Sequence, residues 1–132
     1  MKPLMFLIKI LFRFYRVYEK FAATLPSNKL LLQSLSSEYK KLVANNLPLP
    51  KISEVGIRIF SQTDEDGILL FLFSVIGTKN KTFIEIGSSY CIECNCANLL
   101  LNCGWHGLFI DGNASALELG RQFYRLHPDT RS

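Results

Sequence analysis

Apolar stretches alternate with helical patterns in the second half of the chain. Residues 82–86 (TFIEI) are β-branched and aromatic, and Gly87 closes them, so they predict a buried parallel strand. A helical pattern follows over about residues 93–103, and Gly104 is typical of the position just past a helix. Residues 107–110 (GLFI) then predict a second strand. The pattern therefore predicts a strand–helix–strand unit of the α/β class.

Helical patterns flank this unit on both sides. Residues 67–76 are almost wholly apolar and predict a buried helix, which the segment 63–66 (TDED) opens. We expect Thr63 to cap this helix and the three acids to complement the helix dipole. Residues 115–126 predict the last helix. Only two strands are visible, and two strands are too few for an independently stable sheet, so the chain is expected to be a fragment of a larger domain.

The first half of the chain is helical in pattern. Residues 1–24 predict an amphipathic helix whose apolar arc is wider than that of an ordinary surface helix. Residues 25–50 predict a second helix and then a linker that carries prolines at alternate positions, which forbid helix. We therefore expect a helical arm, separated by this linker from an α/β unit over residues 51–132.

Charge is concentrated at the amino terminus. The chain is 48% hydrophobic and 20% charged, as in ordinary soluble proteins, and its formal net charge is +4. Residues 1–20 account for this whole excess, because a narrow stripe of five cations is opposed there only by Glu19. The five cations are Lys2, Lys9, Arg13, Arg16 and Lys20. Charge is balanced beyond residue 20, which argues against nucleic-acid binding.

Two interpretations of this first helix compete. It either lies in a membrane interface with its cations toward anionic lipid, or it is buried against another part of the protein. Lys9 interrupts the apolar run, which disfavours a secretory signal, and no run of about 18 uncharged apolar residues predicts a membrane span. We expect a cytoplasmic protein, with peripheral membrane contact through residues 1–21 as one alternative.

An acid stands at the end of each predicted strand. Glu85 lies near the end of the first, and Asp111 follows the second. Ligands of doubly wound α/β proteins bind outside the carboxyl ends of the strands, where the amino terminus of the next helix favours an anion. Asp111 lies 24 residues beyond Gly87, close to the spacing of ribose-binding acids in dinucleotide-binding units. The pattern favours a crevice for a nucleoside-bearing cofactor; solvated loop acids are the alternative.

Four segments in order carry a resemblance to a known family. They are FSQTDEDGIL (60–69), FIEIG (83–87), NCANL (95–99) and GWHGLFIDGN (104–113). Over about residues 60–130 the chain resembles the amino-terminal part of the FkbM-related class I methyltransferases, which use S-adenosylmethionine. The resemblance implies a Rossmann-like parallel sheet, here truncated, and O-methylation of a hydroxyl on a sugar, a glycan or another small molecule.

The resemblance also implies roles for individual residues. Glu85 and Gly87 would belong to the loop that faces the methionine part of the cofactor, and Asp111 would hold the ribose. Gln62 and Asp64 would line the cleft from the segment before the first strand. The full predicted cofactor-binding set is Gln62, Asp64, Glu85, Gly87, Ser88, Asp111, Gly112 and Asn113. No catalytic residue is assigned, and we expect no turnover by this chain alone.

The loop after the first strand departs from the family pattern, which usually carries two or three glycines. Gly87 is followed here by Ser88, Ser89, Tyr90 and Cys91. Side chains at positions that need φ > 0 cost about 1–2 kcal/mol each. Two other classes of function stay open. One is a non-catalytic scaffold that binds a membrane or a partner; the other is a nicotinamide-cofactor fold, which the absence of G-x-G-x-x-G disfavours.

The four cysteines cluster between residues 91 and 103. Their C-x2-C-x-C-x6-C spacing lacks the two separated pairs of a structural zinc site, so no metal is predicted. Without a convincing export signal we expect buried, reduced thiols. Cys91 is the exception, because a thiol at a helix amino terminus can have a depressed pKa.

Overall fold

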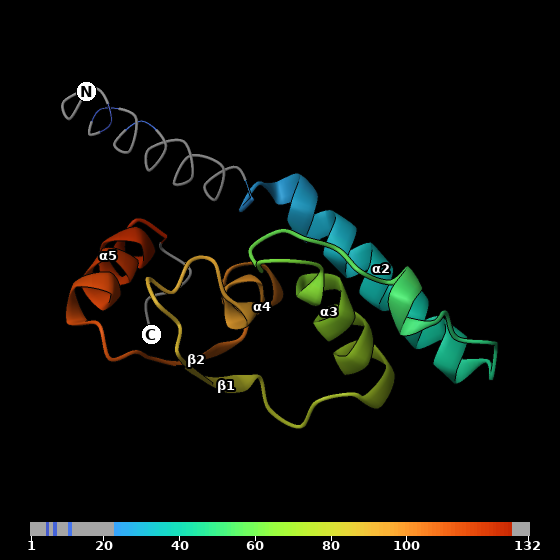
Figure 1. Ribbon diagram of the computed structural model, residues 1–132. Coiled ribbons are helices and arrows are strands. Elements are labelled where there is room, and N and C mark those ends of the chain that lie inside the picture. Colours follow the sequence, from blue (N-terminus) through green and yellow to red (C-terminus); the bar gives the residue numbers. More distant parts are fainter. Residues whose placement is uncertain (1–4, 6, 8–10, 12–22, 128–132) are drawn as a thin grey trace.

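The computed structural model describes residues 5, 7, 11 and 23–127 (Figure 1). Met5, Leu7 and Leu11 are helical and exposed. The rest of the predicted helix over residues 1–24, including its five cations, lies outside the described residues, and so does most of the segment with predicted membrane contact. Within the described part of the chain, no helix is both long enough and apolar enough to cross a membrane.

The described chain is a mixed α/β structure, which confirms the prediction at that level (Figure 1). A parallel pair of strands alternates with helices in the predicted order. The elements are α2 (Pro26–Ala44), the 3-10 helix η1 (Ile52–Glu54), α3 (Glu65–Ile76), β1 (Thr82–Ile86), α4 (Asn95–Cys103), β2 (His106–Ile110) and α5 (Ala114–Arg125). Their ends lie within a few residues of the predicted ones because the apolar periodicity sets them.

Strands β1 and β2 run parallel, and Thr82 pairs with His106 at one end while Ile86 pairs with Ile110 at the other. Helix α4 forms the crossover that a parallel pair requires. The half-buried rings of Phe83 and Phe109 lie together, with their centroids 5.0 Å apart, and Phe109 packs against the core that α4 and α5 contribute to. This face of the sheet is therefore covered.

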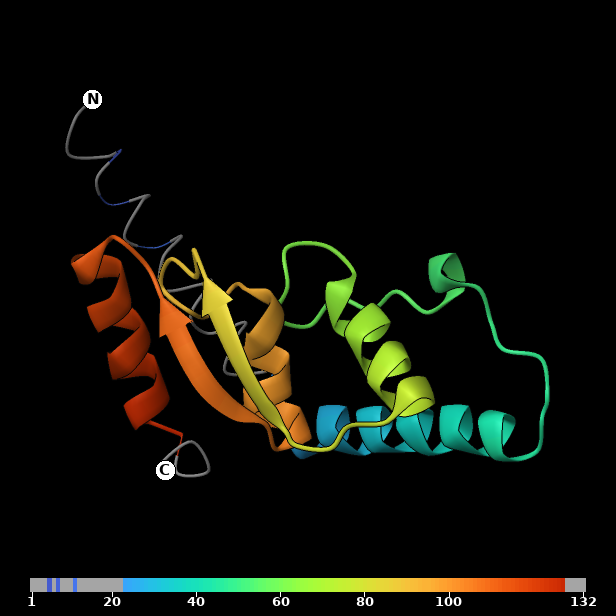
Figure 2. The ribbon, with the colours of Figure 1, turned by 90° about the horizontal axis from the view of Figure 1, so that it is seen from below.

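The opposite face of the sheet is bare in the described part of the chain. Figure 2 shows both strands with no helix in front of them. Four aliphatic side chains there are 42–80% exposed, which are Ile84, Ile86, Leu108 and Ile110. Parallel sheets are normally buried on both faces. The prediction of a buried strand over residues 82–86 thus holds for one face and is wrong for the other.

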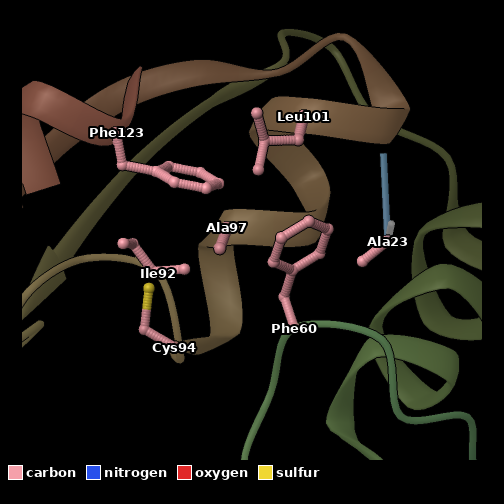
Figure 3. Close-up of a cluster of buried hydrophobic side chains, with 7 residues drawn as sticks. All are labelled: Ala23, Phe60, Ile92, Cys94, Ala97, Leu101 and Phe123. Atoms are coloured by element: carbon pink, nitrogen blue, oxygen red, sulfur yellow. The ribbon is translucent and has the colours of Figure 1, made fainter. Parts of the chain in front are cut away.

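The main core lies between the covered face of the sheet, α4 and α5. Its buried members are Ala23, Phe60, Ile92, Cys94, Ala97, Leu101 and Phe123 (Figure 3). Phe60 and Ala97 are completely buried. Phe60 comes from the loop before α3, so this loop is part of the core rather than a surface connection.

Helix α2 packs on α3 and α4 (Figures 1 and 2). The rings of Tyr39 and Phe71 meet edge to face with centroids 5.0 Å apart. The hydroxyls of Ser36 and Ser74 share a hydrogen bond of 2.8 Å. The proline linker of residues 45–50 is largely exposed and joins α2 to η1.

The carboxyl end of α4 agrees with the predicted signal, and the amino end of α3 does not. Gly104 adopts the left-handed conformation just past α4, and the Trp105 N–H donates to the Leu99 carbonyl (3.0 Å), as predicted for a C-terminal glycine. The predicted cap at Thr63 is wrong. Asp64 is the N-cap of α3 without a side-chain cap bond, and the Thr63 N–H instead donates to the Glu65 carboxylate (3.0 Å).

Candidate functional site at the strand tips

The carboxyl ends of β1 and β2 are joined by hydrogen bonds. Gly87 has φ 79°, and its N–H donates to the carbonyl of Ile110 (2.8 Å). The N–H and hydroxyl of Ser88 donate to the same carbonyl at 3.3 and 3.4 Å. The loop that leaves β1 therefore starts against the end of β2, which brings the two predicted acids to one edge of the sheet.

Glu85 caps the helix that follows its own strand. Its two carboxylate oxygens accept the N–H groups of Asn95 (3.0 Å) and Cys96 (2.8 Å), the first residues of α4. The N-cap residue, Cys94, makes no side-chain cap bond, so Glu85 replaces it. A carboxylate at a helix amino terminus is stabilised by the helix dipole. The anion that sequence reasoning expected there is thus a side chain of the protein.

Asp111 binds the loop and the start of α5. One carboxylate oxygen accepts the Asn113 N–H (2.8 Å), and the other accepts the Ser89 N–H (2.6 Å). These two bonds, the first one foremost, hold the pKa of Asp111 below its ordinary value. Asp111 is therefore an ionised acceptor at neutral pH. The Asn113 side chain in turn accepts the Ala116 N–H (3.1 Å) and caps α5.

In the loop between β1 and α4, two residues with side chains adopt a backbone conformation that favours glycine. Ser89 and Cys91 have φ values of 51° and 61°, in the left-handed region, so both positions carry the cost expected from the missing glycines. Ser88 is only 2% exposed, and its hydroxyl lies 3.5 Å from the Cys91 sulfur. The Tyr124 hydroxyl donates to the Cys91 carbonyl, so α5 holds this loop in place.

Six of the predicted residues converge at this edge, and two do not join them. The converging residues are Glu85, Gly87, Ser88, Asp111, Gly112 and Asn113. Gln62 is exposed, and the Asp64 carboxylate lies against Gly56. Among the described residues, no hydrogen bond or ion pair joins Gln62 or Asp64 to either strand-tip acid. Ser89, which sequence reasoning did not select, joins the site through its backbone.

Asp66 organises the segment that contains Gln62. Its side chain is 1% exposed, and Oδ2 accepts the N–H groups of Ile59, Phe60 and Ser61 at 2.7, 2.6 and 2.9 Å. The Ser61 hydroxyl adds a fourth donor at 3.0 Å. In the sequence Asp66 looks like one of three helix-opening acids, and its neighbours, Glu65 and Gly67, do not set it apart.

All four cysteines are free thiols with raised pKa values. The prediction of a depressed pKa at Cys91 is wrong, because α4 begins at Asn95 and Cys91 is buried in the loop before it. Burial raises the pKa of Cys91 and of Cys94, and it raises those of Cys96 and Cys103 to about 12 and about 11. Among the described residues, no group of three acids, histidines or cysteines could hold a metal.

We expect slow alkylation of the native thiols by iodoacetamide at pH 7.5. At Cys103 a pKa near 11 in place of 9 leaves roughly a hundredfold less thiolate than in the unfolded chain. Mass-spectrometric rates with and without urea measure this ratio at each site. Native Cys91 reacting as fast as Cys91 in urea would contradict its buried position.

The raised pKa values of the thiols also predict that the free energy of unfolding falls in alkaline solution. A thiol whose folded pKa is raised contributes its full stability below the unfolded pKa of about 9. It loses that stability as the pH rises toward the folded value of about 11 for Cys103.

Comparison with known proteins returns no match: no protein-family model, no curated protein and no solved structure matches this chain.

Proposed function

We propose that residues 51–132 form the cofactor-binding part of a Rossmann-like, S-adenosylmethionine-dependent methyltransferase domain. One observation carries the proposal: Asp111 and the loop after Gly87 meet at the carboxyl ends of two parallel strands, joined by the Ser89–Asp111 hydrogen bond. This edge is where open α/β sheets bind their ligands.

Asp111 is suited to hold a ribose. Each oxygen of a carboxylate has two lone-pair sites, and each Asp111 oxygen uses one for a backbone N–H. The remaining sites can accept both ribose hydroxyls of an adenosine. There is also room beside it, since no described residue beyond the two chain neighbours of each glycine comes within 4 Å of the place where a Cβ would stand on Gly87 or Gly112.

Glu85 would attract the amino group of the cofactor's methionine part and repel the carboxylate of that same part. Its own carboxylate already occupies the first N–H groups of α4, so a second anion there would be repelled. A ligand ammonium group beside Glu85 would be attracted. S-adenosylmethionine supplies an electrophilic methyl group, and the protein's share in such a transfer is mainly positioning. The proposed acceptor, a hydroxyl of a sugar or small molecule, follows from the resemblance.

Isothermal titration with S-adenosylmethionine tests the proposal. We expect saturable binding by the full chain, weakened about tenfold or more by Asp111→Ala, since hydrogen bonds to a charged group contribute about 1.5–3 kcal/mol. Glu118→Ala is the matched control, because Glu118 is a partly exposed acid on α5 whose partner is Arg121 (3.5 Å). No binding by the folded wild-type chain, or equal affinity of the two variants, would reject the cofactor site.

A non-catalytic scaffold is the second candidate, and one observation favours it. The carboxylates of Glu85 and Asp111 already hold α4 and the loop in place, so both acids have a structural role without any ligand. The same titration separates the two candidates. A folded chain that binds neither S-adenosylmethionine nor a nicotinamide cofactor would be a scaffold.

A further inference from the structure

A groove of about 780 Å³ lies between α2, α3 and the carboxyl end of α4. It is at the opposite end of the strands from Asp111, because Lys81 directly precedes β1 and His106 begins β2. Figures 1 and 2 show the three helices side by side in this region. None of the predicted cofactor-binding residues lines the groove, so it is a separate site.

The floor of the groove is apolar. Leu32, Leu70, Leu99, Leu101 and Trp105 line it, and all five are buried. The Trp105 ring lies against Phe73, another lining residue, with centroids 4.5 Å apart. Ligand pockets of about 300–1,000 Å³ are typically apolar and carry a few polar groups that orient the ligand. The groove matches this description in size and in the character of its floor.

The rim is basic. Lys29 and Lys40 line the groove from α2, eleven residues or about three turns apart, so they stand on one face of the helix roughly 16 Å from each other. Lys81 and His106 line it from the strand side. None of the lining residues that the structure describes is an Asp or a Glu. Such a rim attracts anions and repels cations.

Lys81 and Lys40 differ in whether their ammonium group already has a partner in the described part of the chain. The Lys81 ammonium donates to the carbonyl of Cys103 (2.9 Å), where it complements the carboxyl end of α4. Lys40 is exposed and, among the described residues, takes part in no ion pair. Its charge is therefore more available to a ligand than that of Lys81.

We infer that this groove binds an amphipathic carboxylate. The apolar body of the ligand would lie on the floor beside Trp105, and its carboxylate would meet the rim at Lys40. The inference goes beyond the proposed cofactor site and does not depend on it, because the two sites share no residue.

Dodecanoate is the probe, and Trp105 is the reporter because it is the only tryptophan of the chain. We expect a saturable change in the fluorescence of the full chain below the micelle concentration. Lys40→Glu should weaken binding about fivefold, through the loss of one exposed charge pair and the gain of a repulsion. Lys41→Glu, an exposed neighbour on α2 outside the groove, should leave the affinity unchanged. Dodecan-1-ol, which has no charge, should bind more weakly than dodecanoate.

Three results would overturn the inference: no saturable change, equal losses in the Lys40 and Lys41 variants, or equal affinity for dodecanoate and dodecan-1-ol. Both substituted lysines are exposed, so neither change should disturb folding, which circular dichroism verifies. Asp111→Ala should leave dodecanoate binding intact. A failure of the cofactor proposal therefore stays distinguishable from a failure at the groove.

Discussion

Replacing Asp66 with alanine is expected to lower the free energy of unfolding by about 3–5 kcal/mol. The side chain is 1% exposed, and a single oxygen accepts three backbone N–H groups and the Ser61 hydroxyl. Removing it leaves the donors of Phe60 and Ser61 buried without an acceptor, and such groups carry their full desolvation cost. The loop before α3 would then lose its anchor.

Urea unfolding monitored by circular dichroism measures this loss, with two variants for comparison. Asp66→Asn keeps an oxygen acceptor of the same shape, so we expect about half the loss or less. Asp64→Ala removes an exposed acid that makes no side-chain cap bond, and it should change stability by less than about 0.5 kcal/mol. Equal losses for Asp66→Ala and Asp64→Ala would show that the buried hydrogen bonds contribute nothing.

Truncating Phe60 to alanine should cost about 3–5 kcal/mol, as expected for a large core side chain that leaves a cavity. Phe60 is completely buried and belongs to the same core as Ala97, Leu101 and Phe123 (Figure 3). That core joins the loop before α3 to α4 and α5. The loss should therefore loosen the whole α/β unit rather than one loop.

Ile84→Ala is the informative comparison for Phe60. Ile84 is also apolar but 69% exposed on the bare face of the sheet, so its truncation should cost less than about 1 kcal/mol. A loss as large as that of Phe60→Ala would mean that the bare face is covered in solution. The Asp66 carboxylate accepts the backbone N–H of Phe60, so the two substitutions loosen the same loop, and the double variant should fall short of the summed losses.

The elements of the fold could be predicted because their signals are local. Apolar periodicity located the strands and the helices from Pro26 onward, and Gly104 marked the end of α4 through its left-handed conformation. The cap of α3 was missed for a physical reason. A side chain such as Thr63 can satisfy a helix end, yet here Asp66 orders the segment from within the helix.

The candidate site was only partly predictable, because its contacts join distant residues. The spacing of Glu85 and Asp111 placed both acids at the strand tips, and the structure puts them there. Nothing in the spacing showed that Glu85 reaches ten residues along the chain to cap α4, or that Asp111 binds Ser89. The environment of Cys91 also depends on α5, whose Tyr124 reaches the Cys91 carbonyl across 33 residues.

The bare face of the sheet has a consequence for the protein in solution. Ile84, Ile86, Leu108 and Ile110 form an aliphatic surface beside two strands whose outer edges carry no partner among the described residues. Open strand edges next to an apolar surface are where sheets add strands from neighbouring molecules. Salts that strengthen apolar burial, such as sulfate, will favour that contact. We therefore expect association between copies to increase with protein concentration and with sulfate.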